Sequence, residues 1–238
     1  MKHGRLIAAA ATTGLVGGSL LLGIPAASAA PGMDKPNKPG KADKTVSLQA
    51  SLSGLNFSGA SGSATATVKN QKIENISISA TGLAPDAAHA IHIHFGEEAR
   101  HECPTMGEAT NVRSATDPTP RLSTADGLPA YGPIVVSLTT TGDTTPASGL
   151  ALSRFPTSTG GELSYNRSKI EFTDVADVGT AKSIADGVRA GEGVLVVHGN
   201  DYNENGAYDF EAAGKSELDP SLPAEGTDPT ACGVLAVR

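Results

Sequence analysis

The sequence predicts an all-β protein, built as an antiparallel β-sandwich or barrel with long loops. Many short runs alternate between apolar and polar residues, which is the period of strands with one buried face. Clusters of Gly, Ser and Asn separate these runs and predict turns. The length from Thr45 to Arg238 suits one large β domain better than two small ones. Many short strands at this spacing are typical of sandwiches and barrels.

The predicted strands follow the apolar alternation along the chain. The first runs extend over residues 46–52, 64–68 and 76–80, and the later ones over residues 134–138, 169–172, 194–198 and 233–237. A short helix at most is expected over residues 175–190, because Gly179 and Gly187 weaken helical structure there. Residues 103–133 and 199–230 have little apolar period and are predicted to be long loops, which are usually functional or disordered.

Residues 1–30 have the composition of a secretory signal peptide. Lys2 and Arg5 give a basic start, and an apolar stretch and then small residues follow. Glycines break the apolar stretch, which favours a cleaved signal over a retained membrane anchor. Residues 31–44 are rich in Pro, Gly and Lys and are predicted to be a flexible tether. We therefore expect a secreted, extracellular protein with a β domain over residues 45–238 and no membrane span after signal removal.

The chain is acidic, with a formal net charge of −7. Removal of the predicted signal peptide takes away two positive charges and leaves −9. An acidic secreted protein is a poor partner for the phosphate backbone of nucleic acid. We therefore expect no nucleic-acid partner.

The chain has two cysteines, Cys103 and Cys232, and export would place them in an oxidising compartment. A disulfide between two such distant cysteines would stabilise the fold, typically by about 2–4 kcal/mol. The alternative is two free buried thiols, which an exported chain makes the less favoured interpretation.

Three histidines, His89, His92 and His94, lie within one six-residue stretch. On a strand, His92 and His94 point to the same face, where two imidazoles can chelate one metal ion. A solvated pair of histidines is the alternative. His198 ends a separate apolar strand, and it favours a three-histidine site with one open coordination position. Such a site suits a metal ion that binds imidazole, and it can hold zinc with a bound water.

The order of these motifs resembles that of the copper-zinc superoxide dismutase family. The matching pieces are Gly82-Leu83, the His89–His94 run, Cys103, the Leu195–His198 run and the Ala231–Leu235 ending. The resemblance implies a Greek-key β-sandwich or barrel of the dismutase type. It implies copper at His92, His94 and His198. It also implies a disulfide between Cys103 and Cys232 and a structural hydrogen-bonding role for His89.

Several features of that family are missing from the sequence. The family has a histidine that bridges copper and zinc shortly after the first cysteine, but none follows Cys103 there. No histidine occurs between His101 and His198, and only Asp126 resembles the aspartate of the family's zinc site. Zinc in the family position is therefore not expected. Pro229 stands where the family has an arginine that guides superoxide, so this substrate would lose a cationic partner.

Two residues between His94 and Cys103 are candidates to replace missing groups. His101 becomes an extra metal ligand if its loop folds back over the metal, and a surface histidine if it does not. We favour the surface histidine. Arg100 is a candidate for the role of the missing arginine, although its spacing does not require it.

A second candidate metal site follows His198 in a loop that resembles the start of a calcium-binding loop. Gly206 would permit the sharp turn, but the glutamate expected at the twelfth position is missing, since Glu211 falls one place early. The alternative is a solvated, turn-rich loop. The candidate calcium ligands are Asp201, Asn203, Asn205 and Asp209.

Three hypotheses of function follow. The first is a copper-dependent superoxide dismutase, an oxidoreductase that converts superoxide to dioxygen and hydrogen peroxide. The second is a secreted protein that binds or carries copper ions without turnover, which the missing bridging histidine and arginine favour. The third is a structural module, because residues 82–94 also resemble the repeat of chordin-type extracellular domains. The Ala231–Val234 motif and the long cysteine spacing favour the dismutase relationship.

Overall fold

The structure, a computed structural model, describes residues 44–238. The predicted signal peptide and the predicted tether up to residue 43 lie outside the described residues. Strand β1 begins at Thr45, where the alternating pattern begins in the sequence. Within the described residues, no helix has the length and apolar character needed to cross a membrane.

One antiparallel sheet of nine strands forms the framework of the domain. The strands follow the order β7-β4-β9-β10-β1-β2-β3-β8, and β11 pairs with β1. Their bounds are β1 Thr45–Gly54, β2 Ser61–Lys69, β3 Lys72–Thr81, β4 Ile91–His94, β7 Ile134–Ser137, β8 Leu163–Glu171, β9 Val194–His198, β10 Pro229–Val234 and β11 Ala236–Val237. A separate small hairpin consists of β5 Asn111–Val112 and β6 Pro120–Arg121.

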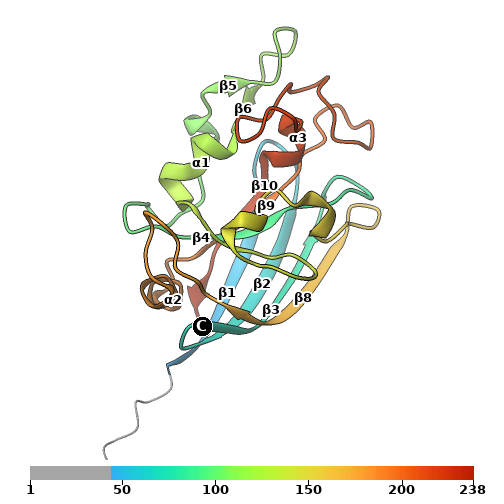
Figure 1. Ribbon diagram of the computed structural model, residues 1–238. Coiled ribbons are helices and arrows are strands. Elements are labelled where there is room, and N and C mark those ends of the chain that lie inside the picture. The colour runs from blue at the N-terminus through green and yellow to red at the C-terminus, as the bar shows by residue number, and fades with distance from the viewer. Residues whose placement is uncertain (1–43) are drawn as a thin grey trace, which may run out of the picture. The chain divides into compact units, whose positions relative to one another are not determined.

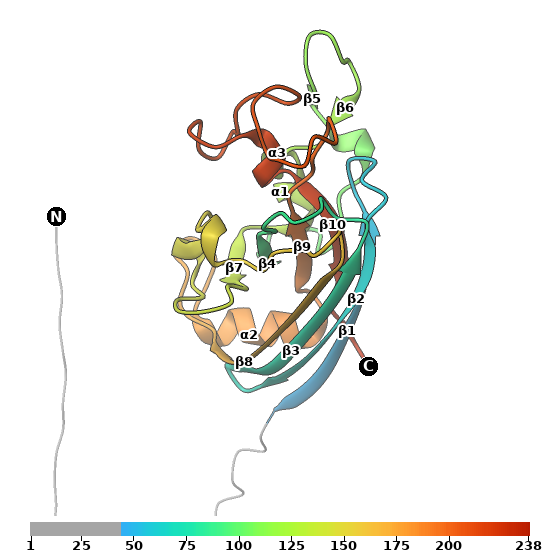
Figure 2. The ribbon, with the colours of Figure 1, turned by 90° about the vertical axis from the view of Figure 1, so that its right-hand side faces the viewer.

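The sheet curls so that its two halves face each other, as Figure 2 shows for β1, β2, β3 and β8 on one side and β4, β7 and β9 on the other. β4 follows β3 in the chain but lies between β7 and β9, and β8 returns to pair with β3. Long crossing connections of this kind are typical of Greek-key arrangements. The predicted class, an antiparallel all-β barrel or sandwich, is confirmed.

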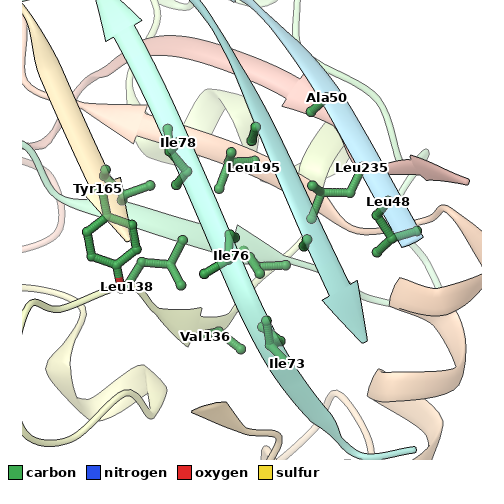
Figure 3. Packing of buried hydrophobic residues seen from close by; sticks show 14 of the residues in the cluster. Leu48, Ala50, Ile73, Ile76, Ile78, Val136, Leu138, Tyr165, Leu195 and Leu235 are labelled. Atoms are coloured by element: carbon green, nitrogen blue, oxygen red, sulfur yellow. The ribbon is translucent and has the colours of Figure 1, made fainter. Parts of the chain in front are cut away.

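The main core fills the space between the two halves of the sheet (Figure 3). Ile76 and Ile78 of β3 and Tyr165 of β8 point inward from one half. Val136 of β7 and Leu195 of β9 meet them from the other half. Alternate residues of β1, β2 and β3 are buried, as the sequence period predicts.

Helix α2, Ala181–Ala190, closes one end of this core. Thr180 caps its first turn by accepting a hydrogen bond from the amide of Ser183, and its buried face contributes Ile184 and Val188. A side chain at Gly187 would collide with the ring of Phe95, so the glycine that weakens the helix also permits its packing. The short helix expected over residues 175–190 is therefore present.

The predicted long loops contain more regular structure than expected. Helix α1, Thr124–Tyr131, lies in the first long loop, and helix α3, Ala224–Thr227, lies in the second. Both helices lie at the end of the sheet where β9 ends and β10 begins (Figure 1). The sequence does contain a start signal for α1, because Ser123 and Asp126 form a capping box. Within residues 44–238 there are also three short 3-10 helices, at Met106–Glu108, Pro146–Ser148 and Leu152–Arg154.

The disulfide that the resemblance implies is present between Cys103 and Cys232, 129 residues apart. It joins the start of the first long loop to β10. Cys232 belongs to a second, smaller apolar cluster with Leu122 and Tyr131, on the other face of β9 from the main core. The disulfide therefore fastens the first long loop over that face.

Replacing both cysteines with alanine should lower the free energy of unfolding by about 2–5 kcal/mol, because the unfolded chain loses a constraint across a long loop. Urea unfolding of the oxidised protein and the double variant measures this difference. Reductant should destabilise the wild type alone, which serves as the control. Equal unfolding free energies for both proteins would contradict a stabilising disulfide.

Candidate metal centre

β4 and β9 are adjacent antiparallel strands, and their register determines which side chains meet. His92 lies opposite Val196, and His94 lies opposite Val194. The backbone amide of His198 donates to the carbonyl of Ala90, which continues the pairing by one step. His198 therefore lies diagonally beside His92 on the same face of the sheet.

That face is the outer one, away from the main core. The intervening Ile91 and Ile93 point into the main core, so His92 and His94 point to the other side, as the sequence predicts. On β9, Val194 and Val196 share the outer face and pack in the smaller apolar cluster. The first long loop, through Leu122 and Tyr131, covers this cluster. The histidines are thus on the outside of the sheet but below the surface of the protein.

The structure brings His92, His94 and His198 together into one buried cluster. Their exposed fractions are 3%, 0% and 2%. One ring nitrogen from each lies within 4.8 Å of the others. The ring centroids are 4.9 Å apart for His92 and His198, 5.7 Å for His92 and His94, and 6.0 Å for His94 and His198. Among the residues that the structure describes, this is the one group of three or more His, Cys, Asp or Glu side chains whose ligand atoms lie close enough together to hold a metal ion.

Backbone carbonyls determine which nitrogen of each imidazole carries the proton. His92 Nε2 lies 3.1 Å from the carbonyl oxygen of Gly149. His94 Nδ1 lies 2.7 Å from that of Gly132, and His198 Nδ1 lies 2.7 Å from that of Thr227. A carbonyl only accepts hydrogen bonds, so each of these nitrogens is the N–H donor.

The other nitrogen of each ring is consequently a free lone pair. These atoms are His92 Nδ1, His94 Nε2 and His198 Nε2, and all three are buried with no hydrogen-bond partner within residues 44–238. Buried polar atoms without partners are rare and costly unless a ligand takes them. Three neutral imidazole lone pairs that converge, each oriented through its second nitrogen, fit a metal ion of the class that imidazole prefers.

Burial makes these histidines hard to protonate. Desolvation is the main cause that lowers the pKa of His94 to about 3 and the pKa of His198 to about 4. It also lowers the pKa of His92 well below its usual value, and the neighbouring histidines lower it further. The neutral form, which is the form that binds metals, is therefore the stable form at neutral pH.

A small pocket of about 10 Å³ opens onto the cluster beside His92 and His198. This volume is about the least that can hold one water molecule. Its other walls are mostly apolar, and within the described part of the chain none of the side chains that line it is charged. The apolar lining residues are Ala90, Ile134, Leu150, Leu152 and Leu218.

A buried ion pair supports the carbonyl that orients His198. Arg121 donates to both carboxylate oxygens of Asp228, at 3.1 and 2.9 Å, and the Tyr202 hydroxyl donates to the same carboxylate at 2.8 Å. Asp228 directly follows Thr227, whose carbonyl accepts from His198 and, at 2.6 Å, from the hydroxyl of Thr124. The pair therefore holds the two long loops together next to the histidine cluster.

His89 lies outside the cluster and contacts the backbone of His198, one of its members. Its ring lies between two carbonyls, with Nδ1 2.9 Å from the oxygen of His198 and Nε2 3.1 Å from that of Ala84. The hydroxyl of Tyr208 lies 3.2 Å from Nδ1. Burial lowers the pKa of His89. These contacts are of the hydrogen-bonding kind that the resemblance implies for this residue.

His101 and Arg100 do not reach the cluster. His101 stacks on Phe95, with ring centroids 5.4 Å apart, and its Nε2 donates to the carbonyl of Gly96 at 2.8 Å. Phe95 belongs to the main core, on the opposite side of the strand from His92 and His94. Arg100 is exposed and pairs with Glu102 and Glu108. The geometry gives neither residue a role at the three histidines.

Asp126 is occupied by a structural role. Its carboxylate accepts hydrogen bonds from the amide and hydroxyl of Ser123, at 2.9 and 3.0 Å, and from the hydroxyl of Thr110 at 2.5 Å. It is therefore a helix-capping residue of α1.

The candidate calcium ligands lie in one loop after β9, where their oxygens accept hydrogen bonds from nearby backbone amides. Asp201 accepts from Gly206 at 2.7 Å, and Asn203 accepts from Asn205 at 3.2 Å. Asp209 accepts from Glu211 at 2.7 Å. The bonds of Asn203 and Asp209, each to the amide two residues on, are those of Asx turns. Calcium binding by this loop stays a prediction.

Sequence reasoning missed Glu225, which fastens that loop from α3. One carboxylate oxygen accepts from the amide of Tyr202 and the other from the amide of Asp209, each at 2.8 Å. Burial raises the pKa of Glu225. The carbonyls that orient the three rings, those of Gly132, Gly149 and Thr227, were also missed. No local sequence pattern predicts them, because the paths of the loops determine their positions.

Comparison with known proteins gives no match, either to a protein-family profile or to a curated protein. The dismutase resemblance therefore rests on the motifs in the sequence.

Stability of the metal-free protein should fall as the pH drops below about 6.5. In this range the unfolded chain protonates its histidines, while buried His94 and His198 stay neutral down to pKa values of about 3 and 4. Each such histidine contributes a slope of up to about 1.4 kcal/mol per pH unit. Urea unfolding between pH 7 and pH 5 measures the loss.

A His94→Gln variant is the control for this titration, since glutamine keeps an N–H donor but does not titrate. Its pH dependence should be shallower than that of the wild type. Asp228, whose pKa burial raises to about 6, acts in the opposite direction in both proteins. Identical slopes for the two proteins would show that His94 is not buried in its neutral form.

Proposed function

We propose that this protein is a secreted copper-binding protein that holds one copper ion on His92, His94 and His198. The observation that carries the proposal is the convergence of three buried, unpartnered imidazole nitrogens, each oriented by a carbonyl on the opposite side of its ring. Imidazole is a good ligand for copper and for zinc. The resemblance of the motifs to copper-zinc superoxide dismutases supports copper.

A purely structural module, as in chordin-type domains, explains the cluster less well. Each buried acceptor left without a partner costs about 1–3 kcal/mol, and here three of them lie side by side. Apolar side chains at positions 92, 94 and 198 would pack without that cost. A bound metal ion compensates for the three lone pairs together.

Superoxide dismutation is the second candidate, favoured by the small pocket that reaches His92 and His198. Copper bound there would supply one-electron redox chemistry, and the pocket would admit a small molecule. The lining of this pocket argues against efficient catalysis, because among residues 44–238 it contains no cationic side chain that would attract superoxide. Arg100, the candidate replacement, is held by two glutamates. Copper binding without efficient turnover is therefore the function that the geometry supports best.

Elemental analysis after mild copper loading should give one copper per chain, and His92→Ala or His198→Ala should abolish it. The loss should exceed the roughly 10–100-fold weakening that follows loss of an outer-shell partner, because a direct ligand is removed. His101→Ala is the matched control and should bind copper as the wild type does.

Unchanged copper binding in the His92→Ala and His198→Ala variants would refute the proposal. A dismutation assay on the loaded wild type separates the two candidates. A rate no higher than that of free copper supports a binding protein, and a clearly higher rate supports the enzyme.

A further inference from the structure

The three-histidine cluster has no negative charge to offset a metal ion. All three ligand nitrogens belong to neutral rings whose protons are fixed by carbonyls. In the described chain, the metal-binding group contains no carboxylate and no thiolate. The nearby buried acid, Asp228, is already paired with Arg121. A bound ion would therefore keep its full charge in the site.

The surroundings of the cluster make such a charge costly. The ligands are at most 3% exposed, and Leu150, Leu152 and Leu218 line the pocket that leads to them. The cost of moving an ion from water into an apolar interior rises with the square of its charge, so a divalent ion costs roughly four times as much as a monovalent one. Apolar walls thus discriminate against divalent ions.

The limited space for further ligands also favours a monovalent ion over a divalent one. The pocket of about 10 Å³ has room for about one water-sized ligand. Copper(II) prefers tetragonal coordination by nitrogen and oxygen. Copper(I) has a filled d shell and no such geometric preference, so three ligands can complete its coordination. Zinc(II) accepts three histidines and a water, but it too brings two uncompensated charges.

We propose, building on the copper-binding function, that this site selects monovalent copper over copper(II) and zinc(II) through its uncharged ligands and its apolar cover of Leu150, Leu152 and Leu218. The ion that the site would bind is copper(I), without an anion bound beside it. The protein would hold copper in the reduced form and raise its reduction potential above that of aqueous copper.

The test loads the metal-free mature protein with copper(I) in competition with a chromophoric copper(I) chelator, and then challenges it with zinc(II). If the site binds copper(I) ten times more tightly than copper(II), the reduction potential of the bound copper lies about 59 mV above that of aqueous copper. We expect a preference for copper(I) of at least about a hundredfold. A hundredfold excess of zinc should leave the copper in place. Redox titration with mediators measures the potential independently.

Leu218→Glu and Leu150→Glu place a negative charge at the mouth of the pocket, at positions that are 42% and 38% exposed. Each should lower the potential and strengthen zinc competition about tenfold or more. Leu128→Glu is the matched control, because Leu128 is 40% exposed but does not line this pocket. It should leave both measurements unchanged.

The outcomes separate this inference from the proposed function. If neither copper(I) nor copper(II) binds at one ion per chain, the copper-binding function itself fails. If copper binds but zinc displaces it readily, or the potential is no higher than that of aqueous copper, the cuprous selectivity fails while copper binding stands. Equal effects of Leu218→Glu and Leu128→Glu would show that the apolar cover does not set the preference.

Discussion

Hydrogen bonds from three buried imidazoles to backbone carbonyls give the candidate metal centre its geometry. Gly132, Gly149 and Thr227 each accept the proton-bearing nitrogen of one ring, and the second nitrogen of that ring is left as a free lone pair. If one ring turned over, its N–H would point into the cluster and disrupt it. The orientation of the rings, more than their presence, makes the cluster able to hold a metal ion.

The carbonyls lie in connections outside the sheet, so the site depends on how those connections are fastened. The Cys103–Cys232 disulfide holds the first long loop against β10. The Arg121–Asp228 ion pair joins the first and second long loops beside Thr227. Rigid strands provide the ligands, and cross-linked loops orient them. This division between scaffold and loops is common in functional sites.

Much of this could be predicted from the sequence, because strand periodicity reports directly which face a residue occupies. The alternation around His92 and His94 placed both on one face, and the apolar run before His198 placed it on a neighbouring strand. Helix α1 has a local start signal in Ser123 and Asp126, which the apolar period of its segment did not reveal. The Arg121–Asp228 pair and the carbonyl acceptors could not be predicted, since they depend on contacts between segments 29 to 107 residues apart in the chain. The apolar pocket likewise brings Leu150 and Leu218 together from separate loops.

X-ray absorption spectroscopy at the copper edge of the loaded mature protein tests whether the three histidines bind the ion, because it identifies the atoms in contact with the metal. We expect a first coordination shell dominated by three imidazole nitrogens, and the loss of one imidazole in the His94→Gln variant. A first shell composed mainly of oxygen or sulfur ligands, or a spectrum that is the same in the variant, would contradict it.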